Sequence, residues 1–183
     1  MKKKPQLRRR FTKWLVSKIG PFFDSHYVVR NNLLDEPGLE QAFDAFDNRD
    51  YYDAFEMFLD AAKVGNAMAQ YNVGLCYDTN SGVLRDDQAA EEWYRKAAEQ
   101  GIGKAQYNLC CLLAADIMTS DDKSSQEDQD RKMVDAYMWL TIANEQGCSE
   151  SADAPKRVAA HMGPEQIEEA EKLAREWIEK RRQ

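Results

Sequence analysis

The pattern of apolar and polar positions along residues 65–101 occurs more than once in the chain. Its motif Ala69-Gln70-Tyr71-Asn72 returns as Ala105-Gln106-Tyr107-Asn108, at an offset of 36 residues. The later part of the pattern returns once more at an offset of 46 residues, from Trp93 to Trp139, so this third copy carries a ten-residue insertion. A fixed period of this length is typical of a solenoid of helix hairpins, in which no single repeat can bury its apolar face alone.

Each repeat is predicted to contain two helices. Residues 67–78 predict the first, because their apolar side chains fall on one face of a 3.6-residue period. A glycine inside a helix costs about 1 kcal/mol relative to alanine, so Gly74 predicts that a neighbouring helix approaches closely. Asp86 predicts the N-cap of the second helix, which Gly101 ends. Trp93 is expected in the core, where truncation to alanine would cost about 3–5 kcal/mol.

The same reasoning extends over most of the chain. Helix pairs are expected near residues 37–64, 67–100, 103–146 and 150–180, so the predicted fold is all-α and the repeat domain spans 37–183. Residues 116–130 interrupt the third pair with an acidic, aperiodic stretch, and this composition predicts a loop.

Residues 67–101 resemble a Sel-one-like repeat, a relative of the tetratricopeptide repeat. The matching positions are Ala69-Gln70, Gly74, Tyr77, Gly82-Val83, Asp86, Ala90, Trp93-Tyr94, Ala97-Ala98 and Gly101. The resemblance covers roughly residues 37–180. The chain departs from the family at Asn80 and Cys110, where glycines are usual, and at Lys132, where the capping aspartate would be.

This resemblance implies an α-solenoid, a right-handed superhelix of about four stacked antiparallel hairpins. It also implies an adaptor or scaffold, since the family acts in bacterial envelope, secretion or signalling contexts. A small subset of the family is reported to bind β-lactams. The alternatives to an adaptor are therefore a hydrolase or β-lactam-binding protein, and an immunity or regulatory protein that binds a specific effector.

The charge of the chain is divided unequally. Residues 1–30 hold nine Lys or Arg and one acid, while the net charge of the whole chain is −7. Residues 1–36 are therefore predicted to be a basic amphipathic arm and linker, separate from the acidic repeats. One helical face of this arm would carry Phe11, Trp14, Leu15, Ile19 and Phe22.

The sequence leaves the role of this arm open. It could cap the open end of the solenoid, lie on an anionic membrane or act as a targeting segment. Binding to nucleic acid is not favoured, because the acidic remainder of the chain would repel phosphates.

The sequence offers little for chemistry. It has two His and four Cys with no C-x-x-C pair, and no phosphate-binding loop, nucleophile elbow or zinc motif. We therefore expect no enzymatic activity, no cofactor and no metal site. The cysteines are expected to be reduced thiols, which favours the cytoplasm, or the inner face of a membrane if the arm binds lipid.

The function is expected on the concave side of the solenoid, which the first helix of each repeat lines in tetratricopeptide-like folds. The predicted groove residues are Tyr71, Asn72, Leu75, Tyr107, Asn108 and Cys111. The matched Tyr–Asn pairs would suit an extended peptide or a helix of a protein partner. In an alternative interpretation, Asn72 and Asn108 bond only to neighbouring backbone carbonyls and stabilise the stack.

Overall fold

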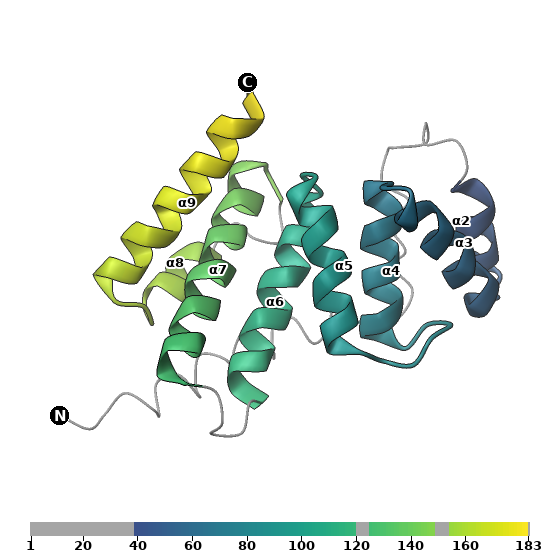
Figure 1. The fold of residues 1–183 in the computed structure, drawn as a ribbon, viewed down its shortest axis with the longest axis horizontal. Helices are drawn as coiled ribbons and strands as arrows, with labels where there is room; N and C mark the ends of the chain where they lie inside the picture. Colours follow the sequence, from purple (N-terminus) through teal and green to yellow (C-terminus); the bar gives the residue numbers. More distant parts are fainter. Residues whose placement is uncertain (1–38, 120–124, 149–153, 183) are drawn as a thin grey trace. The chain divides into compact units, whose positions relative to one another are not determined.

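The computed structural model describes residues 39–119, 125–148 and 154–182. All regular elements in these ranges are helices, and no strand occurs among them, which confirms the predicted all-α fold (Figure 1). The described residues form two compact units, 39–105 and 106–182, which are considered one at a time. The basic arm and linker predicted for residues 1–36 lie outside the described residues.

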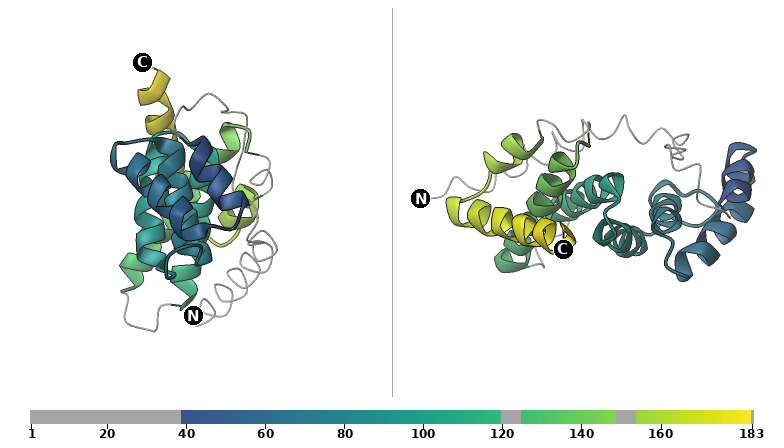
Figure 2. Two further views of the ribbon diagram at one scale, coloured as in Figure 1. Left: turned by 90° about the vertical axis from the view of Figure 1, so that its right-hand side faces the viewer. Right: turned by 90° about the horizontal axis from the view of Figure 1, so that it is seen from above.

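The N-terminal unit contains four helices in sequential order. They are α2 (Glu40–Asp47), α3 (Tyr51–Lys63), α4 (Ala67–Thr79) and α5 (Asp87–Glu99). Helix α3 packs against both α2 and α4, and α4 packs against α5 (Figures 1 and 2). The pairs predicted near 37–64 and 67–100 are therefore present.

The turn between α4 and α5 is built from residues with unusual backbone angles. Asn80 has φ of 57° and Gly82 has φ of 76°, both in the left-handed region. A Cβ atom at Gly82 would lie 2.0 Å from the Tyr51 carbonyl oxygen, so the turn packs directly on the start of α3. Asp86 then caps α5 as predicted, because its Oδ1 accepts hydrogen bonds from Gln88 N and Ala89 N, both at 3.0 Å.

Gly74 and Tyr94 hold α4 and α5 together. A Cβ atom at Gly74 would lie 2.7 Å from Tyr94 Cδ1, so the glycine allows the close approach that the sequence predicted. Tyr94 is completely buried, whereas Trp93 is half-buried, with Lys96 Nζ 3.9 Å from the centroid of its ring. The expectation that Trp93 is the core aromatic of this hairpin is therefore wrong. Tyr94, one position along, faces α4 instead.

The C-terminal unit contains α6 (Gly103–Thr119), α7 (Gln126–Glu145), α8 (Ala154–Ala159) and α9 (Pro164–Arg182), with the unit boundary near the start of α6. Helix α7 packs against α8 and α9. An ion pair between Lys132 on α7 and Asp116 on α6 links these two helices. Helices are therefore present over the ranges predicted for the two further pairs.

The acidic stretch 116–130 is more ordered than predicted. Helix α6 continues through Thr119 and α7 begins at Gln126, so both ends of the expected loop are helical. The cause at the second end is Ser125, whose Oγ accepts a hydrogen bond from Asp128 N at 3.1 Å. Acidic side chains in the first turn of a helix also interact favourably with its dipole. The acids after Ser125 thus belong to the start of α7, and only residues 120–124 of the predicted loop lie outside the described residues.

Candidate functional site

Three of the six predicted groove residues lie on α4 in the N-terminal unit, and they are less exposed than a binding surface requires. Tyr71 is 4% exposed and Asn72 is 1% exposed, while Leu75 is half-buried. The Tyr71 ring packs near the Tyr94 ring, with 5.8 Å between the centroids. On α4, therefore, Leu75 is the member of the predicted set that keeps appreciable exposed surface.

Asn72 makes the bond that the alternative interpretation describes. Its Nδ2 donates a hydrogen bond to the Met68 carbonyl oxygen one turn earlier, at 2.9 Å. Its Oδ1 is buried and has no hydrogen-bond partner among the described residues. A buried acceptor without a donor costs about 1–3 kcal/mol. Asn72 is thus a brace of the helix that retains one unused acceptor.

The other three predicted groove residues lie on α6, in the C-terminal unit. Tyr107 and Asn108 are half-buried, and Cys111 is buried. The repeated Tyr–Asn pair is therefore more accessible on α6 than on α4. Because the two helices belong to different units, each triplet is a candidate surface of its own unit.

Gln70, which belongs to the same repeated motif as Tyr71 and Asn72, takes part in a chain of side-chain amides that stabilises the N-terminal unit. Gln100 Nε2 donates to Gln70 Oε1 at 2.7 Å and to the Gly65 carbonyl oxygen at 3.0 Å. Gln70 Nε2 in turn donates to the Ala62 carbonyl oxygen at 3.3 Å. This network connects the ends of α3 and α5 with the first turns of α4. The repeated Ala-Gln motif could have indicated this amide network, but the sequence analysis used the motif only to find the period of the repeat.

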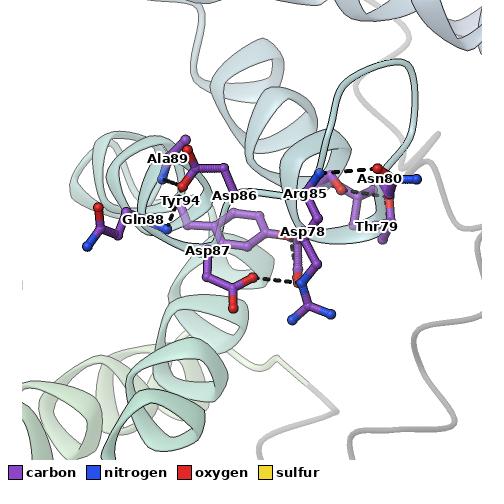
Figure 3. A network of polar contacts seen from close by, with 10 residues as sticks. Asp78, Thr79, Asn80, Arg85, Asp86, Asp87, Gln88, Ala89 and Tyr94 are labelled. Carbon is purple, nitrogen blue, oxygen red and sulfur yellow. Dashed lines mark hydrogen bonds and ion pairs between the residues drawn. The ribbon is translucent and has the colours of Figure 1, made fainter. Parts of the chain in front are cut away.

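A second polar network lies at the other end of the α4–α5 hairpin, and Figure 3 shows it. Asp78 is 4% exposed, and Tyr94 donates its hydroxyl hydrogen to Asp78 Oδ2 at 3.3 Å. The second oxygen, Oδ1, has no hydrogen-bond partner in the part of the chain that the structure describes. Burial raises the pKa of the Asp78 carboxyl to about 6, although the nearby Arg85 charge and the Tyr94 hydrogen bond act to lower that pKa.

The outer part of this network fixes the turn. Arg85 Nε donates to Asp87 Oδ1 at 2.7 Å, and Arg85 N donates to Asn80 Oδ1 at 3.2 Å. Both side-chain partners of Arg85 lie on the surface, so Arg85 faces solvent while Asp78 is enclosed. Sequence reasoning missed Asp78, because an acid near the end of a helix looks like any solvated residue.

The chemistry that these residues can perform is limited. Burial raises the pKa of the Cys76 and Cys110 thiols to about 12 each, so both stay protonated at neutral pH and are poor nucleophiles. All four cysteines are free thiols. Within the described ranges, no three His, Cys, Asp or Glu side chains gather closely enough to hold a metal ion.

Two findings concern the membrane. Among the described helices, none combines the length and the apolar character that crossing a bilayer requires. The residues proposed for a capping or membrane-binding arm, Phe11, Trp14, Leu15, Ile19 and Phe22, lie outside the described residues.

Comparisons with known proteins agree with this architecture. The Sel1 repeat family model matches residues 67–102 and 103–148. The chain is 34% identical over 64 residues to chitin synthase regulatory factor 3 of Schizosaccharomyces pombe, a match that covers 35% of this chain and 7% of that protein. A solved structure also matches, with a TM-score of 0.65, 26% identity and coverage of 78% of this chain and 29% of the other. It is the crystal structure of c5321, described as a protective antigen present in uropathogenic Escherichia coli strains displaying an SLR fold.

The helix hairpins and the structural match together define the class of protein, an α-solenoid. Residues 67–148 match two Sel1 repeats, so this part of the chain consists of Sel1-like helical repeats. Proteins of this family are generally protein-interaction adaptors, and the fold is typically a non-catalytic scaffold. The chain spans less than a third of the length of either relative, so what those whole proteins do is not transferred to it.

Proposed function

We propose that this chain is a non-enzymatic adaptor that binds a peptide or a helix of a protein partner through the first helices of its repeats. The observation that carries the proposal is the Tyr–Asn pair, which stands at matched positions of α4 and α6 in two Sel1 repeats. A stacked helical hairpin leaves one face of its first helix without a packing partner from the same repeat, and such faces suit peptides and amphipathic helices.

The accessible members of each triplet would make the contact. These are Leu75 on α4, and Tyr107 and Asn108 on α6, all half-buried. A half-buried apolar or aromatic side chain can anchor a partner without first unfolding its own helix. The unused acceptor of Asn72 could take a partner's N–H group only if the side chains that bury it moved, because Asn72 is 1% exposed.

The test compares variants of these accessible positions in the full chain. We expect Leu75→Glu and Tyr107→Ala each to reduce capture of specific partner proteins, identified by mass spectrometry, about tenfold or more. Val64→Glu is the matched control, because Val64 is a strongly exposed apolar residue outside both triplets. The proposal is overturned if the Leu75 and Tyr107 variants keep their melting temperature and still capture the same proteins as the control.

Two parts of the proposal need separate experiments. A hydrolase and β-lactam-binding screen on the purified chain tests the non-enzymatic assignment, and turnover or saturable β-lactam binding would contradict it. For residues 1–30, peripheral contact with the inner face of a membrane predicts flotation of the chain with anionic vesicles and not with neutral ones. If the segment caps the repeats instead, its deletion lowers the melting temperature and flotation is absent.

A further inference from the structure

The turn between α4 and α5 displays a large apolar side chain in solvent. Leu84 is 83% exposed there, and Tyr52 on the first turn of α3 is 66% exposed. Single exposed apolar residues are common on protein surfaces and need no explanation. These two differ from that background because the structure brings their backbones close together and fixes the turn that carries one of them.

Their proximity follows from the packing of Gly82. A Cβ atom at Gly82 would lie 2.9 Å from Tyr52 N, so the backbones of the turn and of α3 are in contact. Leu84 is only two residues beyond Gly82, and each residue extends the chain by at most about 3.6 Å. Tyr52 N and the Leu84 Cα are therefore within about 12 Å of each other, a span that one short peptide segment can cover.

The turn that carries Leu84 is fixed at both ends. Ser81 N donates to the Cys76 carbonyl oxygen at 2.9 Å, and Asp86 N donates to the Tyr77 carbonyl oxygen at 3.3 Å. Between these bonds, Asn80 Oδ1 accepts from Arg85 N. An anchor that is already held in place loses little conformational entropy when a partner binds. The backbone that carries Leu84 is thus preorganised for binding.

The surface around Tyr52 and Leu84 is predominantly acidic. Asp50, Asp53 and Glu56 are exposed on and before the first turns of α3, and Asp86 and Asp87 are exposed at the start of α5. The exposed cations beside them are Arg49 and Arg85, and Arg85 is already paired with Asp87. Complementary charge steers a partner and selects among partners, so the acids favour a basic one.

We propose that Tyr52 and Leu84, with the acids around them, form a second docking surface, called here the turn patch. It binds a protein segment in which a large apolar side chain is flanked by Lys or Arg. The apolar side chain would contact Tyr52 and Leu84, and the basic residues would lie over Asp53, Glu56 and the start of α5. This surface uses none of the residues of the proposed adaptor function, so the two partners would be bound by different residues.

The test selects ligands without assuming a partner. A phage-displayed library of random dodecapeptides is selected on the full chain, and enriched peptides are synthesised for titration. We expect a consensus of an apolar residue with Lys or Arg on both sides. Tyr52→Ser and Leu84→Ser should each weaken binding of these peptides about tenfold or more, since a few apolar anchors dominate such contacts. Asp53→Lys together with Glu56→Lys should weaken binding and reduce its dependence on salt.

Val64→Ser is the matched control, because Val64 is as exposed as Leu84 but lies at the other end of α3. It should leave peptide binding unchanged, as should Leu75→Glu, which probes α4. The side chains of Tyr52, Asp53, Glu56, Val64 and Leu84 are exposed, so circular dichroism melts of their variants should match the parent. The proposal is overturned if no basic consensus is enriched, or if the peptides bind the Tyr52 and Leu84 variants as tightly as the Val64 control.

Discussion

The hairpins α4–α5 and α6–α7 follow the same sequence pattern but fill their cores differently. In the first, the glycine at position 74 receives the ring of Tyr94. In the second, the matched positions hold Cys110 and Leu140, and both are buried. A larger residue on the first helix thus goes with a smaller one on the second. Cores tolerate this kind of exchange when the total volume is kept, because it leaves neither a void nor an overlap.

The tryptophans at matched positions of the two hairpins show a second difference. Trp93 on α5 is half-buried beneath Lys96, whereas Trp139 on α7 is buried and packs edge-to-face on Trp177 of α9, with 5.9 Å between ring centroids. Within the C-terminal unit, α9 supplies the cover. A tryptophan at the same position of the repeat is therefore fully or only half buried, depending on whether another helix packs on it.

The largest expected effect tests which aromatic residue is the core of the first hairpin. Tyr94→Ala should lower the free energy of unfolding by about 3–5 kcal/mol, because it removes a fully buried ring and its hydrogen bond to Asp78. Trp93→Ala should cost only about 1–2 kcal/mol, as a half-buried side chain does. Guanidinium unfolding followed by circular dichroism measures both. Equal losses in the two variants would contradict the assignment of Tyr94 as the core residue.

The next effect concerns Asp78 and its hydrogen bond from Tyr94. The second hairpin has no such bond at this place, because Leu140 stands at the position that matches Tyr94. The folded pKa of about 6 lies above the unfolded value near 3.9, so the folded state binds a proton more tightly. Its ionisation therefore destabilises the fold fully above about pH 6, and this penalty disappears as the pH falls towards 4. We expect protonation of Asp78 to raise the free energy of unfolding of the parent chain by about 2–3 kcal/mol as the pH falls from above 6 to 4.

The Asp78→Asn variant isolates the contribution of this carboxyl. It keeps an oxygen that can accept the Tyr94 hydrogen bond but carries no charge, so it should be more stable than the parent at pH 7.5 and nearly equal at pH 4. Urea titrations at several pH values give the comparison. A parent and a variant that respond to pH identically would show that Asp78 is not the titrating group.

A smaller effect tests the exchange of volume between helices directly. Gly74→Ala places a methyl group against the Tyr94 ring and should cost about 1–3 kcal/mol, partly offset by about 1 kcal/mol of better helix propensity. The double variant Gly74→Ala with Tyr94→Leu imitates the Cys110–Leu140 arrangement. The double variant should lose less unfolding free energy than the sum of the losses in the two single variants, and a double-mutant cycle measures this difference. Additive losses would mean that the two positions do not compensate each other.

The smallest effect compares the two helix starts. Asp86 caps α5, whereas the matched position in the second hairpin, Lys132, lies inside α7 and Ser125 is the cap. Asp86→Ala and Ser125→Ala should each cost about 1 kcal/mol, and Ser125→Asn should cost much less, because its amide oxygen can also accept the Asp128 N–H. Hydrogen exchange of the first turn of α7 localises the change. No change there would contradict the assignment of Ser125 as a cap.

Much of the fold could be predicted because the repeat combines independent local signals. The period, the left-handed turn residues and the Asp86 cap all act over a few residues of chain, so their structural consequences follow from short-range geometry. The limits of the acidic stretch could not be predicted from composition. Whether its second end joins a helix depended on one serine, Ser125, which caps α7.

The candidate site was less predictable than the fold. Placement of Tyr71, Asn72 and Leu75 on the first helix of a repeat followed from the motif, but their exposure did not. Asn72 bonds within its own helix, so this amide stabilises α4. The turn patch had no sequence signal, because Tyr52 and Leu84 are far apart in the chain and only the packing of Gly82 on α3 brings their backbones close together.

The sequence by itself determined that this protein is a series of helix hairpins, where each hairpin turns, and that Gly74 must lie beside another helix. The tertiary structure alone decided that Tyr94 and not Trp93 fills that space, that Asp78 is enclosed with the Tyr94 hydroxyl as its donor, and that the turn carrying Leu84 packs on the start of α3. The physical reason is one of range. Turns, caps and periodicity are properties of neighbouring residues, whereas burial depends on side chains that other helices bring to the same point.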